Sequence, residues 1–360
     1  MIRVRLVVAG IVAFCLLPRN HLSGEGVMGY KNNSLKLAAR ILVLAVGAVF
    51  LFSSMALAQW EPRKPIKFVV MAGKGGGAGK LSRLFQGIIE KNNFSSQPFV
   101  PDYKKGGSGA EALVYMKGKT GDSHTVLLTL NSYFTTPLRQ PALNVDIATF
   151  TPIARMAMDT FVLWVHATTD IKNLDDFVRT VKSQGRKWNM GGTGRGQEDQ
   201  LLTNILKSTF NLDMNYTPFK GGGTVAKNLA GMHINSTVNN PSEAIPFFES
   251  NDMSKKVRPL VAFTPNRLAV FPDVPTFSEL GYSGLSYFMQ RSVIGPPKMP
   301  AEAVAYYVKV FEKVHNSNQW KKHAAKKALF RDFLTGSKLQ AFFMKERDKH
   351  RELLKSTGEL

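Results

Sequence analysis

The chain has 360 residues, a formal net charge of +21 and a single cysteine, Cys15. This length allows about two domains, and the cysteine count excludes a disulfide framework and a cysteine-based metal site. The positive charge favours anionic ligands or acidic surfaces, but no stretch interleaves aromatic and basic residues as a single-strand nucleic-acid channel does.

An export signal is predicted at the N-terminus. Three basic residues lie between 31 and 40, an apolar run covers 41–52, and Ala56-Leu57-Ala58 follows. This is the pattern of a signal peptide that begins near Met28 and is cleaved after Ala58. We therefore expect a leader over 1–58, with an over-extended start before Met28, and a periplasmic mature protein. Export also argues against a nucleic-acid partner. An uncleaved membrane anchor is the alternative. The mature net charge would be about +16.

The first stretch after the leader, IKFVVMAGKGGGAGKLSR over 66–83, predicts a strand, a glycine loop and a helix. A P-loop does not fit, because Lys74 occupies the position of its first glycine and Leu81 follows Gly79-Lys80. A dinucleotide fingerprint fits only loosely, and a tight turn without a ligand stays open. We favour a loop that binds a carboxylate or phosphate, because it presents backbone N–H groups at the positive end of a helix dipole.

Three more glycine loops are predicted between strands and helices, at Lys104–Gly109, Gly191–Gln197 and Phe219–Thr224. Alternating strands and helices predict an α/β fold with largely parallel sheets. Two strands end in Asn131-Ser132 and Asn239-Asn240, and ligands bind at that end of parallel strands. Two α/β lobes that face each other would bring all four loops to a shared cleft.

The C-terminal part is expected to be helical and to pack on the first lobe. Its apolar stripes are Val304, Tyr307, Val308 and Phe311, then Leu339, Phe342, Phe343, His350 and Leu354.

No catalytic residue is predicted. The six histidines after the leader form neither an HExxH motif nor a zinc-ligand cluster, and no GxSxG elbow is present. Glu198-Asp199 is the best acid pair, but neighbouring helical residues point in different directions, and acids are common at helix starts because of the dipole. We therefore expect a protein that is not an enzyme and has no cofactor and no metal.

Several motifs resemble those of substrate-binding proteins of tripartite tricarboxylate transporters, the Bug or TctC-like family. The resemblance starts at Trp60-x-Pro62-x-Lys64-Pro65-Ile66 and covers nearly the whole chain after the leader. Its further motifs are GGGAGKLSR, KKGGSGAEA, FTPIARMAM, NMGGTGRGQ, PFKGGGTVAKNLAGMHI, PNRLAVFPDVPTFSELGY and IGPPKMP. It implies a two-lobed periplasmic-binding-protein fold, type II-like, whose two α/β domains are joined by a two-strand hinge. Lobe 1 is expected over 59–160 plus 289–360, and lobe 2 over 161–288.

The resemblance also implies a ligand site. Its expected residues are Gly75, Gly76, Gly77, Ala78 and Ser132 from lobe 1, and Thr193, Gly194, Gly196 and Asn239 from lobe 2. Arg195 is added because a guanidinium can pair with a second carboxylate, which favours a di- or tricarboxylate. A solvent-facing position is the alternative for Arg195, and Arg291 has the same two interpretations. Where the family often has Thr-Asp, this chain has Ala78-Gly79, which makes an amino-acid ligand less expected.

The function that the resemblance implies is a receptor that closes on a small carboxylate and delivers it to a permease with one large and one small integral-membrane subunit. We expect a monomer. A sensor that presents the same ligand to a membrane signalling partner is the alternative, and the sequence does not separate the two.

Overall fold

The strands form two sheets. The computed structural model describes residues 60–360, so the predicted leader, its cleavage site and Cys15 lie outside the described residues. The strands of the first sheet are β1 (Ile66–Val70), β2 (Phe99–Tyr103), β3 (Thr125–Leu128), β4 (Thr151–Thr160), β10 (Phe288–Gly295) and β11 (Phe330–Leu334). Those of the second sheet are β5 (Val162–His166), β6 (Asn189–Thr193), β7 (Asn215–Phe219), β8 (Ser236–Asn239) and β9 (Val257–Ala262).

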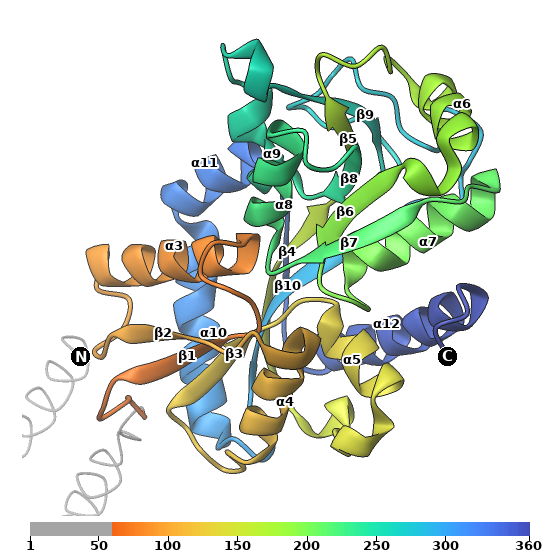
Figure 1. Cartoon of the computed structure of the whole chain (residues 1–360). Helices are drawn as coiled ribbons and strands as arrows, with labels where there is room; N and C mark the ends of the chain where they lie inside the picture. The colour runs from red at the N-terminus through yellow and green to blue at the C-terminus, as the bar shows by residue number, and fades with distance from the viewer. Residues whose placement is uncertain (1–59) are drawn as a thin grey trace, which may run out of the picture. The chain divides into compact units, whose positions relative to one another are not determined.

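The chain passes from one sheet to the other between β4 and β5 and returns between β9 and β10. The strand order is β11-β4-β10-β3-β1-β2 in the first sheet and β7-β6-β8-β5-β9 in the second. In Figure 1, β4 and β10 run side by side toward the second sheet. We call each sheet with its helices a lobe, so the fold is the expected two-lobed α/β fold with two crossing strands. The lobe boundaries given above stay a prediction.

The expectation of largely parallel sheets is wrong. Only β1, β2 and β3 in the first sheet, and β6, β7 and β8 in the second, pair in parallel. The pairs of β10 with β3 and β4, of β11 with β4, and of β5 with β8 and β9 are antiparallel. The cause is the crossing: β10 returns to the first sheet next to the strand that left it and runs in the opposite direction.

The helices of lobe 1 are α3 (Gly77–Lys91), α4 (Ala110–Lys117), α5 (Ser132–Arg139), α10 (Ala301–Asn316), α11 (Asn318–Lys326) and α12 (Gly336–Ser356). Those of lobe 2 are α6 (Leu174–Gln184), α7 (Glu198–Phe210), α8 (Gly222–Ala230) and α9 (Pro241–Phe248). The predicted loops at 73–77, 191–197 and 219–224 lead into α3, α7 and α8. One boundary differs, because β6 continues through Gly191, Gly192 and Thr193. The sequence analysis did not identify α5, α9 or β11.

The predicted packing of the C-terminal helices on lobe 1 is confirmed. In α10, Phe311 lies edge-on to Phe99 of β2, with ring centroids 5.8 Å apart. In α12, Phe343 contacts Tyr133 of α5 at 5.2 Å. Leu339, Phe343, His350 and Leu354 are fully buried on one side of α12, so this stripe belongs to the core.

Candidate functional site

A cavity of about 420 Å³ is lined by residues of both lobes, a volume in the range of small-molecule sites. The residues of lobe 1 that line the cavity belong to the start of α3 and the loop before it, to the turn before α4, and to β10. Those from lobe 2 come from the starts of α7, α8 and α9 and the segments before them. The polar and charged side chains on this wall are Lys105, Ser108, Thr193, Gln197, Glu198, Asp199, Lys220, Asn240, Glu243 and Arg291.

Glu243, in the first turn of α9, connects the second lobe to the first helix of the first lobe. Its Oε1 accepts a hydrogen bond of 2.6 Å from the backbone N–H of Gly77, where α3 begins. The first N–H groups of a helix have no partner within the helix, and the dipole favours a negative charge there. Gly222 makes room for this carboxyl group, because a Cβ at that position would lie 1.7 Å from Glu243 Oε2.

Glu198 and Asp199 begin α7, and their carboxyl groups accept hydrogen bonds from two different segments of the chain. Glu198 Oε1 accepts a 2.9 Å hydrogen bond from the backbone N–H of Ser132, at the start of α5 in lobe 1. Asp199 Oδ2 accepts one of 2.8 Å from the backbone N–H of Thr193, at the end of β6 in its own lobe. Two carboxyl groups from lobe 2, those of Glu243 and Glu198, therefore hold helix starts of lobe 1.

The carboxyl groups of Glu198, Asp199 and Glu243 are buried, which is unusual for acidic side chains. Burial raises the pKa of Glu198, of Asp199 and of Glu243 above their ordinary values. For Asp199 the negative charges of Glu243 and Glu198 raise the pKa further. Arg291 opposes the rise of the pKa of Glu198 and of Glu243.

Arg291 lines the same cavity from β10, but its charge is already paired. It is 2% exposed, and its Nε donates to Asp159 Oδ2 at 3.0 Å, with a second bond to the same oxygen from Nη2. Asp159 lies on β4, so the pair joins the two crossing strands. Burial raises the pKa of Asp159, and Arg291 opposes that rise.

Half of the predicted site residues line the cavity and half do not. Gly76, Gly77, Ala78, Thr193 and Gly194 line it. The other five, Gly75, Ser132, Arg195, Gly196 and Asn239, are not part of its wall.

These five lie close by in other roles. The backbone N–H of Ser132 is bound by Glu198, and Asn239 Nδ2 donates to the carbonyl of Gly222 at 2.9 Å. Gly75 lies beside a separate smaller cavity. Gly196 has a positive φ of 72° and packs against the guanidinium of Arg139.

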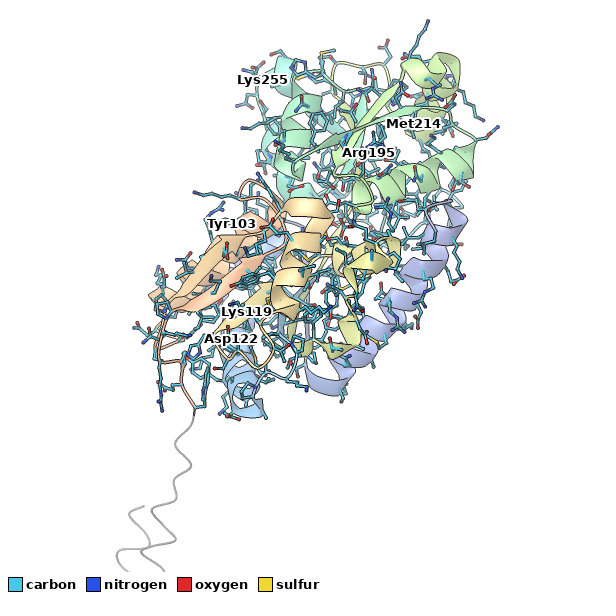
Figure 2. The ribbon with its side chains drawn as sticks, turned by 60° about the horizontal axis from the view of Figure 1, so that its bottom comes forward. Tyr103, Lys119, Asp122, Arg195, Met214 and Lys255 are labelled. Atoms are coloured by element: carbon cyan, nitrogen blue, oxygen red, sulfur yellow. The ribbon has the colours of Figure 1, made fainter. Side chains whose placement is uncertain are left out.

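Arg195 is exposed on the turn between β6 and α7 in lobe 2 (Figure 2), away from the wall of the cavity. Its backbone carbonyl accepts a hydrogen bond of 2.8 Å from Ser108 Oγ of lobe 1. Its main chain therefore takes part in the contact between the lobes, and its side chain takes the solvent-facing alternative.

Sequence reasoning missed Glu243, Lys105 and Lys220, and it set Glu198-Asp199 aside. A signal for Glu243 was present, because it follows the strand end Asn239-Asn240 by three residues, where ligands of α/β sheets bind. Lys105 and Lys220 are exposed and lie in two of the predicted glycine loops.

Comparison with known proteins gives the family. The sequence model described as tripartite tricarboxylate transporter family receptor matches residues 86–358. The chain belongs to this family. A UPF0065 protein of Bordetella pertussis is 26% identical to this receptor over 261 residues, which are 71% of this chain and 78% of that protein.

Solved structures share the receptor's fold. The periplasmic binding protein BugD has a TM-score of 0.75 and 19% identity, over 82% of this chain and 98% of its own. Rpa4515 of R. palustris, solved with adipate, has a TM-score of 0.76 and 22% identity, over 82% and 98% of the two chains. Together with the two sheets, these likenesses confirm the periplasmic-binding-protein fold. Within residues 60–360, no helix combines the length and hydrophobicity that a membrane span needs.

Proposed function

We propose that this chain is a periplasmic receptor that captures a small organic acid between its two lobes and delivers it to the membrane subunits of a tripartite tricarboxylate-type permease. The observation that carries the proposal is the meeting of three helix starts, those of α3, α7 and α8, at one cavity shared by both lobes. Helix starts supply N–H donors and positive potential to an anion. The receptor works by binding and closure, without covalent chemistry.

The similarity to known receptors supports this proposal from another side. The family is one of transporter receptors, and Rpa4515, which has the same fold, was solved with a dicarboxylate. The permease subunits, a monomeric state and export by the predicted signal peptide are part of the proposal.

The proposed ligand class differs from the sequence prediction in the number of acid groups that it requires. An organic acid fits the helix starts and the two exposed lysines on the cavity wall, Lys105 and Lys220. The preference for a di- or tricarboxylate depended on Arg195, whose side chain is exposed and outside the wall. We therefore propose a small carboxylic acid and do not retain the requirement for a second or third acid group.

Thermal unfolding with a panel of organic acids tests the proposal. A ligand present at about 100 times its Kd stabilises a receptor by about 2.7 kcal/mol, which raises the Tm by several degrees. Unchanged Tm values across mono-, di- and tricarboxylic acids and amino acids of two to six carbons would contradict it.

A charge reversal locates the binding. Lys105→Glu combined with Lys220→Glu should weaken binding of the acid several-fold, because the acid would meet like charges at the cavity wall. The matched control is Lys91→Glu combined with Lys255→Glu. Both control positions are exposed and outside the wall, and Lys255 lies at the end of lobe 2 away from lobe 1 (Figure 2). Equal loss in both variants would place the ligand elsewhere.

A further inference from the structure

The carboxyl group of Glu243 occupies one of the helix starts at which an organic acid would bind. Its Oε1 accepts a hydrogen bond of 2.6 Å from the backbone N–H of Gly77, at the start of α3. Its Oε2 lies against Gly222, the first residue of α8, where a Cβ would be only 1.7 Å away. An acid group that binds to the start of α3 needs the same N–H donor. Glu243 therefore competes with such an acid group for Gly77.

The side chain of Glu243 also has a second place to go. It lines the smaller cavity, of about 330 Å³, as well as the larger one. The wall of the smaller cavity includes Lys80 of α3 and Lys227 of α8. Because Glu243 belongs to both walls, rotation about its own side-chain bonds between staggered rotamers can carry the carboxyl group from one cavity toward the other.

The two lysines of the smaller cavity are able to receive that carboxyl group. Both are exposed, and within residues 60–360 neither Lys80 nor Lys227 forms a salt bridge. Burial raises the pKa of Glu243, and the charges of Arg291 and Lys80 oppose that rise, so Lys80 is near enough to act on the carboxyl group. A carboxylate is less costly beside exposed ammonium groups than in a buried position.

We propose that Glu243 is an intramolecular competitor of the ligand. Its carboxyl group binds at the start of α3 until the acid group of a ligand replaces it there, and it then moves to Lys80 and Lys227. The inference rests on the proposed function and describes the regulation of the same site. The competition lowers the affinity of the receptor, because part of the binding free energy is used to displace Glu243. The acid group then connects the two lobes in place of Glu243.

Calorimetric titration of Glu243→Asp tests the competition, with acetate, succinate, adipate and citrate as probes. This variant keeps the charge but is shorter by one methylene group, so its carboxylate no longer reaches Gly77. We expect it to bind at least one probe about fivefold or more tighter than wild type, a ratio that the loss of one competing hydrogen bond produces. Glu249→Asp is the matched control at an exposed position directly after α9, and its affinities should stay within about twofold of wild type.

A double-mutant cycle tests the second position of the carboxyl group. Lys80→Gln combined with Lys227→Gln should weaken binding of the probe about threefold, because the displaced Glu243 then lacks its cations. In a Glu243→Ala background the same two substitutions should change the affinity no more than the control does. The control is Lys91→Gln combined with Lys187→Gln, which removes the same charge from exposed positions outside both cavities. If Glu243→Ala does not fold, Glu243→Asp serves as the background.

The outcomes separate this inference from the proposed function. An acid that binds wild type and Glu243→Asp equally well, or binds the variant more weakly, would overturn the inference and leave the proposed function intact. Equal losses from the lysine substitutions in both backgrounds would also overturn it, because the lysines would then act on the ligand itself. If neither wild type nor Glu243→Asp binds any acid of the thermal panel, the proposed function fails, and this inference fails with it.

Discussion

The two lobes treat their buried acids in opposite ways. In lobe 1, Asp159 is paired with Arg291, and both side chains are almost completely buried. In lobe 2, Glu198, Asp199 and Glu243 line the same cavity and accept backbone N–H hydrogen bonds, and none of them forms a salt bridge within residues 60–360. The difference separates an acid held by an ion pair within one lobe from acids held by backbone N–H groups, two of them across the lobes. The ion pair holds the two crossing strands together, whereas Glu243 and Glu198 hold helix starts of the opposite lobe.

The first test removes Arg291, the partner of the buried Asp159 in lobe 1. Arg291→Met should reduce the free energy of unfolding by about 3–5 kcal/mol, because it leaves Asp159 buried without its partner. Denaturant titration measures the change. The control is Arg267→Met, which breaks the exposed pair with Glu279 and should cost no more than about 1 kcal/mol. Similar small losses in both variants would show that the pair of lobe 1 is not structural.

The second test disturbs the carboxyl group that joins the lobes. Gly222→Ala places a methyl group 1.7 Å from Glu243 Oε2, so Glu243 or α8 must move. We expect a loss of about 1–3 kcal/mol, typical of overpacking. Gly87→Ala is the control, since that exposed site in α3 has open space around it. The control should gain about 0.5–1 kcal/mol from reduced chain entropy. A neutral Gly222→Ala would contradict the close packing of Glu243.

The third test uses the pH dependence of the lobe 2 acids. Burial raises the pKa of Glu243 above its ordinary value of 4.5, so the folded chain keeps a proton that the unfolded chain has already lost. The resulting stability is fully present below pH 4.5 and is lost as the pH rises through the raised pKa. Because a glutamine side chain does not titrate, the ligand-free Glu243→Gln variant should gain stability relative to wild type as the pH rises above 4.5.

Denaturant titrations at several pH values measure this slope, with Glu249→Gln as the exposed reference. A difference between Glu243→Gln and wild type that is constant with pH, or that falls as pH rises, would mean that Glu243 is ionised in the fold and already compensated. The lobe 2 acid would then resemble Asp159.

The smallest expected effect is that of Arg195→Ala. The side chain is exposed and outside the cavity wall, so stability should change by less than about 0.5 kcal/mol. Affinities for mono-, di- and tricarboxylates should change by less than twofold, and by the same factor. A larger loss for the polyacids, seen by calorimetry, would restore the role that the sequence suggested for Arg195.

Much of the fold could be predicted from local sequence patterns. Strand-loop-helix units are visible in stretches such as 66–83, because strand and helix periodicities change at a glycine run. No local sequence pattern indicates whether neighbouring strands run parallel or antiparallel. The antiparallel return of β10 depends on its pairing with β4 more than a hundred residues away, so the mixed character of the sheets could not be predicted from periodicity.

The site was predictable where the backbone makes it. The loops that contain Gly76, Gly77 and Gly194 could be found from their glycines alone. The acids could not, because their role depends on the opposite lobe. Glu198 and Asp199 do point in different directions, as helical neighbours should, yet both reach the cavity because α7 begins at its wall. Glu243 lies on α9, whose approach to α3 is set by the crossing strands.

A crystal structure of the receptor with the organic acid that raises its Tm most tests the central claim most directly. We predict the ligand in the cavity between the lobes, with a carboxylate oxygen within about 3.2 Å of a backbone N–H group at the start of α3, α7 or α8. A ligand bound outside this cavity, or one whose carboxylate faces the three acids, would contradict the account.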